Sequence, residues 1–165
     1  VDDLPLMRVS DYLSFLAEAI ISAVTERVWA EMLSKYGTPT CVLGDNLCDL
    51  GFIVVGYGKF GGLEMGYDSD LDLVFLHAGN WEDTQGAEIS IDSTQFYIKM
   101  GQQVINILGG QTITGALYET DLRLRPDGMK GILVQNINAY RVDAQTQKFY
   151  LYQHDKVKYY LTFFV

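Results

Sequence analysis

The chain has 165 residues, 48% of them hydrophobic, and a formal net charge of −9. That apolar content is enough to bury the core of one domain, whereas a surface of negative sign repels the phosphates of nucleic acid. No apolar run approaches the roughly 20 residues that span a bilayer, and the N-terminus lacks a signal-peptide pattern, so we expect a cytoplasmic protein without nucleic-acid or membrane partners.

The first half of the chain is predicted to form one long helix and two strands. Apolar residues recur at spacings of three and four from about 11 to 36, which indicates a helix that Ser10 caps. Short apolar runs at 51–56 and 70–76 fit buried strands. The glycine-rich segment 56–67 between them is expected to be a loop.

The second half is predicted to begin with an exposed, acidic loop at 77–92 and a helix at 93–108. Strands at 116–125 and 132–134 and a helical segment at 136–150 follow. One stripe of the helix is expected to face the core: Phe96, Met100, Val104, Ile107 and Leu108. This order of elements predicts an α+β fold, with a small mixed β-sheet flanked by helices and a long N-terminal helix.

Cysteine and histidine are expected to carry no chemistry here. Cys41 and Cys48 lie in the turn-rich stretch 38–51, where a disulfide or half of a metal site is conceivable, but we expect two free thiols. His77 and His154 have no companion at metal-ligand spacing, so both are expected to be structural.

Three aspartates are the candidate metal ligands and catalytic groups. Side chains alternate along a strand, so Asp70 and Asp72 are expected to point the same way while Leu71 and Leu73 point into the core. If the strand that carries Asp121 pairs beside the first, its carboxylate joins the other two, and bound magnesium (Mg2+) relieves their repulsion. The alternative is a solvated strand face. The metal site is favoured because the leucines imply a half-buried strand, where idle carboxylates are costly.

The glycine-rich loop is the candidate phosphate-binding backbone. Gly61 and Gly62 let the chain approach phosphate oxygens closely, with N–H groups as donors. The spacing of Gly56, Gly58 and Gly61 formally matches a dinucleotide-binding fingerprint, but a broken stretch follows instead of a helix, and the next acidic residues come too soon. The Walker pattern fails as well, because the lysine is not followed by Ser or Thr.

Polar and basic side chains near the aspartates are further candidates for nucleotide binding. Ser69 offers a hydroxyl donor, although a plain turn residue explains it equally well. Lys59 is a candidate phosphate contact, with a surface lysine as the alternative. Arg123 and Arg125 share a strand face with Asp121, which suits a triphosphate or its pyrophosphate leaving group; structural pairing with acidic residues is the alternative.

Two segments closely resemble the signature of the glutamine synthetase adenylyltransferase family. They are 54–73, with the sequence VVGYGKFGGLEMGYDSDLDL, and 115–128, with the sequence GALYETDLRLRPDG. The opening 13–36 and the helical stretch 96–103 are similar as well. The first segment resembles the C-terminal, adenylylating domain of that family, since the AMP-removing domain typically has Met in place of Tyr57.

This resemblance implies the nucleotidyltransferase fold and the transfer of AMP from ATP to a tyrosine hydroxyl of glutamine synthetase, a step in nitrogen metabolism. It implies Asp70, Asp72 and Asp121 as the ligands of Mg2+. Residues 1–165 would then be a single nucleotidyltransferase domain of a longer, two-domain, multifunctional enzyme, lacking its C-terminal helices. A PII-type signalling protein acting through the full-length chain is a further implied partner.

The tail departs from the family pattern. Where the family tends to have Trp-x-Trp-Glu-His-Gln, this chain has FYLYQHD at 149–155. Position 60 is Phe where Leu is usual, which is a small apolar change. The altered tail keeps a second hypothesis open, a regulatory or interaction module that retains the fold without catalysis. The phosphorolytic removal of AMP is a third.

Overall fold

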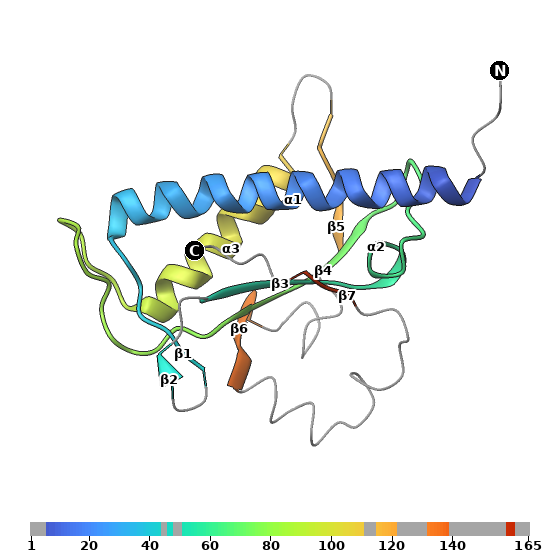
Figure 1. The fold of residues 1–165 in the computed structure, drawn as a ribbon. Coiled ribbons are helices and arrows are strands. Elements are labelled where there is room, and N and C mark those ends of the chain that lie inside the picture. Colours follow the sequence, from blue (N-terminus) through green and yellow to red (C-terminus); the bar gives the residue numbers. More distant parts are fainter. Residues whose placement is uncertain are drawn as a thin grey trace.

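The computed structural model describes residues 6–43, 46–47, 51–110, 115–121, 132–138 and 158–160. Its elements are, in chain order, α1 (Leu6–Tyr36), β1 (Val42–Leu43), β2 (Asn46–Leu47), β3 (Phe52–Gly56), α2 (Gly58–Gly61), β4 (Leu71–His77), α3 (Ser93–Leu108), β5 (Thr120–Asp121), β6 (Val134–Asn136) and β7 (Lys158–Tyr160). Figure 1 shows the long α1 and the crossing α3 on one side of the sheet. The predicted α+β fold, with a small mixed sheet, flanking helices and a long N-terminal helix, is confirmed.

Among the described residues, the main sheet has five strands and is built around β4. β3 runs antiparallel to β4, and β7 runs antiparallel to β3 on the far side. β5 and β6 both run parallel to β4 along its other edge, β5 beside its first two residues and β6 beside its last three. Parallel neighbours need a long crossover, and α3 lies in the connection between β4 and β5. The sequence did not predict β7, although it predicted the positions of β3 and β4 closely.

Helix α1 begins earlier than its apolar periodicity indicates. Ser10 lies inside the helix, where its carbonyl accepts the Ser14 hydroxyl at 2.8 Å, so the prediction that Ser10 caps the start was wrong. The helix ends at Tyr36 as predicted. Gly37 follows with φ +80°, and a Cβ there would lie 2.2 Å from the Gln85 carbonyl oxygen, so only glycine fits this exit.

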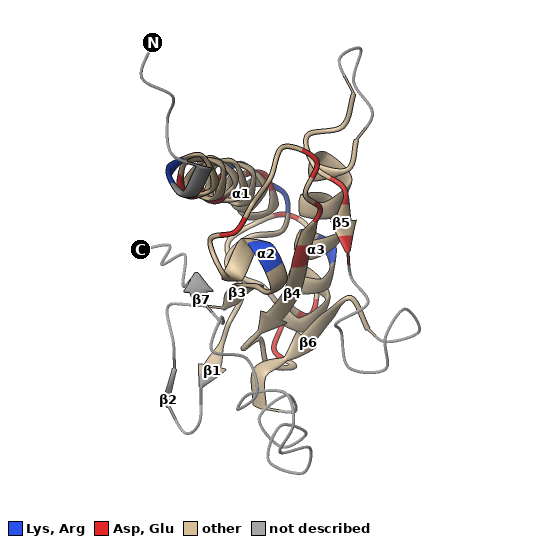
Figure 2. Cartoon of the chain, turned by 90° about the vertical axis from the view of Figure 1, so that its right-hand side faces the viewer, with Lys and Arg blue, Asp and Glu red and all other residues tan. Residues whose placement is uncertain are grey.

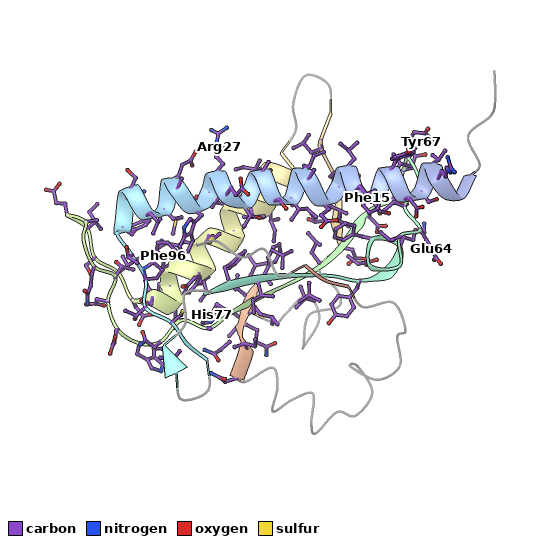
Figure 3. All side chains as sticks on the ribbon, viewed as in Figure 1. Phe15, Arg27, Glu64, Tyr67, His77 and Phe96 are labelled. Carbon is purple, nitrogen blue, oxygen red and sulfur yellow. The ribbon has the colours of Figure 1, made fainter. Side chains whose placement is uncertain are left out.

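The core lies between the helices and one face of the sheet. Its central residues are Ala17, Ile21, Val24, Val28 and Met32 of α1, Phe52 and Val54 of β3, Leu71, Leu73 and Phe75 of β4, and Phe96, Tyr97, Met100, Val104 and Leu108 of α3. Phe96 packs edge-on against Trp29 with ring centroids 5.5 Å apart, and Figure 3 shows it beneath α1. The predicted apolar stripe of α3 is therefore confirmed, with Ile107 only partly buried.

The alternation of β4 decides which side chains face away from the helices. Leu71 and Leu73 belong to the core under α1 and α3, as predicted. Val74 and Leu76 belong to a second cluster on the other face of the sheet, together with Val55. Because side chains alternate along a strand, Asp72, which lies between the two leucines, also faces away from α1 and α3.

Cys41 joins the start of the β1–β2 hairpin to the end of β4. Its backbone forms an isolated antiparallel β-bridge with Gly79, and the Val42 N–H donates to the Ala78 carbonyl at 2.8 Å. Cys41 is disulfide-bonded, so the prediction that both cysteines are free thiols was wrong. The other cysteine, Cys48, lies outside the described residues. Among the residues that the structure describes, no helix is both long enough and apolar enough to cross a bilayer.

His77 at the end of β4 is a structural histidine, as predicted. It is 2% exposed, its ring stacks on Tyr97 with centroids 5.7 Å apart, and its Nδ1 accepts the Gly79 N–H at 3.1 Å. Desolvation by burial lowers the pKa of His77 to about 4, against a weaker opposing effect of the Asp92 charge. The ring is therefore neutral in the folded protein near pH 7.

We expect His77 to make the protein less stable as the pH falls. Between pH 6.5 and 4 the unfolded state binds the extra proton, so the free energy of unfolding decreases by at most about 1.4 kcal/mol per pH unit. Urea unfolding at pH 7 and pH 5 should show a larger loss in the wild type than in His77→Phe, which keeps the stacking on Tyr97 but cannot titrate. Equal losses in the two proteins would contradict the assignment.

Candidate functional site

Asp72 and Asp121 lie side by side on neighbouring strands. The parallel pairing of β4 and β5 sets Leu71 opposite Thr120 and Asp72 opposite Asp121, and the Leu71 N–H donates to the Glu119 carbonyl at 2.8 Å. Residues opposite each other in a ladder project from the same face, with strands about 4.8 Å apart. The two carboxylates therefore leave the sheet together, on the face turned away from α1 and α3.

Asp70 precedes β4 by one residue and is partly exposed. Within the described residues its carboxylate forms no hydrogen bond and no ion pair. Figure 2 shows acidic positions on the neighbouring strands β4 and β5, with the basic position of α2 beside them. The structure thus brings together the segments that carry the three predicted aspartates.

The chain passes over Asp72 directly after β3. The Tyr57 N–H donates to the Asp72 carbonyl at 2.9 Å, which fixes the start of α2 against β4. Gly58 has φ +56°, and a Cβ at this position would lie 2.1 Å from Asp72 Oδ2. A side chain at this position would be strained by the positive φ and would push the Asp72 carboxylate out of the place it occupies. Gly58 is therefore part of the wall that positions Asp72.

The glycine-rich segment 56–67 was predicted to be a loop; the structure has the short helix α2 at Gly58–Gly61 and turns or irregular chain from 62 to 67. The N–H groups of Gly61 and Gly62 donate to the carbonyls of Tyr57 and Gly58 at 2.9 and 3.0 Å. These two amides are engaged in backbone hydrogen bonds of α2, and their role as phosphate donors stays a prediction. The Lys59 side chain is exposed on the same short helix.

A tight turn precedes the aspartates. The Ser69 N–H donates to the Gly66 carbonyl at 3.2 Å, and Ser69 Oγ accepts the Gly66 N–H at 2.8 Å. Met65 before the turn is buried in the core. Ser69 therefore fixes the approach of the chain to Asp70, and its hydroxyl proton remains able to donate.

The residues present suit magnesium if the substrate completes its coordination. In the described part of the chain, no three His, Cys, Asp or Glu side chains gather closely enough to enclose a metal ion by themselves. Mg2+ usually takes one or two carboxylates, several waters and substrate phosphates. Asp72 and Asp121 supply oxygen donors from one face, and the space left by Gly58 accommodates the Asp72 carboxylate. Arg123 and Arg125 lie outside the described residues.

Sequence reasoning missed the role of Gly58. In the sequence this glycine takes part only in a formal match to a dinucleotide-binding fingerprint, which the residues after it rule out, whereas the structure places it against the Asp72 carboxylate. A glycine required by contact with a residue 14 positions further along the chain leaves no local signal. Only the fold shows that β3 and β4 run antiparallel, so that the end of β3 meets the start of β4.

Comparison with known proteins identifies relatives over most of the chain. Residues 1–148 match the family model described as glutamate-ammonia ligase adenylyltransferase. A protein of Pseudomonas syringae pv. tomato is 51% identical over 138 residues, which are 83% of this chain and 14% of the relative. Proteins of Pseudomonas putida and Pseudomonas aeruginosa are 50% and 47% identical, over 88% and 92% of this chain and 15% of each relative.

All three relatives are named bifunctional glutamine synthetase adenylyltransferase/adenylyl-removing enzyme. The chain spans only 14% to 15% of the length of these curated relatives. The similarity therefore covers a small part of each relative and most of this chain.

Proposed function

This chain belongs to the glutamate-ammonia ligase adenylyltransferase family, and on that premise we propose that it transfers AMP from ATP to a tyrosine hydroxyl of glutamine synthetase in the cytoplasm. The observation that carries the proposal is the register of β4 and β5, which sets Asp72 directly opposite Asp121 on one face of the sheet. Two carboxylates in that arrangement, with Asp70 next to them, form a site for magnesium and a nucleotide.

The reaction is a displacement at the α-phosphorus of ATP. The tyrosine oxygen forms a bond to this phosphorus, the bond to the bridging oxygen breaks, pyrophosphate leaves, and the hydroxyl proton passes to water. Magnesium, when bound, neutralises charge on the phosphates and the attacking oxygen. Asp70, Asp72 and Asp121 would hold it, and the rigid strand pairing keeps Asp72 and Asp121 in place during the reaction.

The remaining predicted residues have roles in holding ATP. We assign Lys59 on α2 and the hydroxyl of Ser69 to the phosphates, together with Arg123 and Arg125, which follow Asp121 closely in the sequence. Positive side chains opposite the metal-binding aspartates would orient the triphosphate so that pyrophosphate can leave. A PII-type signalling protein would regulate this activity through the longer protein.

The experiment that tests the proposal is the transfer of labelled AMP from ATP to purified glutamine synthetase. We expect label on glutamine synthetase in the presence of magnesium and none after the metal is removed with a chelator. Transfer that persists at full rate without any divalent cation would contradict the metal site. No label under either condition would contradict AMP transfer itself.

The names of the relatives support a second candidate activity, the removal of AMP. The same three aspartates would hold magnesium for this reaction. An oxygen of inorganic phosphate forms a bond to the phosphorus of the AMP group, the bond from this phosphorus to the tyrosine oxygen breaks, and ADP and the free tyrosine hydroxyl are the products. Incubation with adenylylated glutamine synthetase and phosphate separates the two activities, because only the removing enzyme releases ADP. A domain that retains the fold without catalysis would give neither product, and calorimetry would show no metal-dependent binding of ATP.

A further inference from the structure

Tyr67 lies at the tip of the turn that leads into the aspartates. Its side chain is 84% exposed, although an aromatic ring is ordinarily valuable for the apolar area that it buries. Figure 3 shows Tyr67 and Glu64 at the end of the molecule where α2 and the start of β4 lie. Asp70 follows Tyr67 by three positions, a stretch of chain that spans at most about 10 Å. A partner that contacts Tyr67 is therefore held close to the aspartates.

The turn presents this ring from a fixed backbone. The Ser69 N–H donates to the Gly66 carbonyl, the Gly66 N–H donates to Ser69 Oγ, and the side chain of Ser69 is buried. Met65, immediately before the turn, is anchored in the core. A preformed turn loses little conformational freedom when a partner binds, so a contact with the Tyr67 ring costs little conformational entropy.

The surroundings of Tyr67 indicate what kind of partner fits. Glu64 and Asp68, on the same segment, are exposed acidic residues. A partner surface that complements an exposed ring beside two acidic side chains is an apolar recess bordered by basic side chains. A nucleotide base is a poor fit, because small-molecule sites are concave and enclose their ligand, whereas the described part of the chain places no wall over a ring that is exposed to this degree.

We infer that Tyr67 is a docking residue for the protein substrate, and that it inserts into an apolar recess with a basic border on glutamine synthetase, near the tyrosine that accepts AMP. The inference rests on the proposed function, which supplies the identity of that substrate. Tyrosine is enriched among the few residues that dominate protein–protein binding energies. Tyr67 thus sets which protein is brought to the aspartates and takes no part in the chemistry.

Two measurements test this role. Binding of glutamine synthetase is measured by biolayer interferometry without ATP, and AMP transfer is measured at varied concentrations of glutamine synthetase. In Tyr67→Ala we expect the Kd and the KM for glutamine synthetase to rise at least about tenfold, since loss of an interface anchor costs more than about 1.4 kcal/mol. The kcat and the Kd for ATP with magnesium should stay within about twofold, and Tyr67→Phe should resemble the wild type.

Trp81→Ala is the matched control, because Trp81 is 85% exposed but follows the opposite end of β4. It should change neither binding nor transfer. An unchanged Kd for glutamine synthetase in Tyr67→Ala overturns the inference, and so does weakened ATP binding with normal binding of glutamine synthetase. A wild-type protein that does not bind glutamine synthetase also overturns it. If the wild type binds through Tyr67 but transfers no AMP, the proposed function fails and the docking surface stands.

Discussion

The Asp72→Asn variant is expected to transfer AMP at least about a hundredfold more slowly than the wild type. Asparagine has the same shape, so it fits in the space beside Gly58 and leaves the pairing of β4 intact. It lacks the negative charge that would hold magnesium against the phosphates. The rate is measured with labelled ATP and purified glutamine synthetase, and thermal unfolding should show that the variant remains folded.

The control for this prediction is Asp83→Asn. Asp83 is exposed in the segment after β4, at the end of the strand away from Asp72, and its change removes the same charge from the surface. Its transfer rate should match the wild type. If Asp72→Asn is equally active, the aspartates do not form the metal site and the catalytic proposal fails. If both variants are slow, a general effect of net charge explains the result better than a local site.

The parts of the fold that the sequence predicted well are those whose buried faces repeat regularly. Helix α3 has the predicted bounds, because its stripe from Phe96 to Leu108 follows one helical face and Asp92 caps its start by accepting the Gln95 N–H at 3.1 Å. Strands β3 and β4 were located from short apolar runs between glycines and aspartates. In each case the local pattern and the tertiary packing require the same residues.

The parts that were missed depend on contacts distant in sequence. β7 pairs with β3 although about a hundred residues separate Val54 from Tyr160, and its own sequence carries no sign of that partner. Helix α2 is one turn of a glycine-rich segment, which local propensity does not favour, and its contacts with β4 compensate. Leu16 fits the apolar spacing of α1, yet it is exposed because the buried stripe passes through Ala17 and Ile21 instead.

The candidate site was predictable up to its register. The alternation of β4 predicted that Leu71 and Leu73 face the core, and this is confirmed. The metal-site hypothesis required that the strand of Asp121 pair beside β4. The spacing of residues in the sequence does not specify which residues of two strands lie opposite each other. The structure supplies this register and places Asp121 beside Asp72. The binding of metal and nucleotide by these residues stays a prediction.

The Phe96→Ala variant is expected to destabilise the protein by about 3–5 kcal/mol, the usual cost of removing a fully buried aromatic ring. Phe96 is 0% exposed and its ring packs edge-on against both Trp29 and Tyr97, with centroids 5.5 Å apart in each pair. The change leaves a cavity where α1 and α3 meet above the sheet, and the rigid packing around it cannot close fully. Urea unfolding measures the loss as a lower midpoint.

Phe15→Ala serves as the matched control for this prediction. The same ring is removed from α1, but Phe15 is 51% exposed, so the free energy of unfolding should fall by only about 1 kcal/mol, clearly less than in Phe96→Ala. A comparable loss in both variants would mean that the exposed face of α1 is packed as tightly as its core side. A small loss in Phe96→Ala would contradict the packing of α3 beneath α1, on which the position of β4 and its aspartates depends.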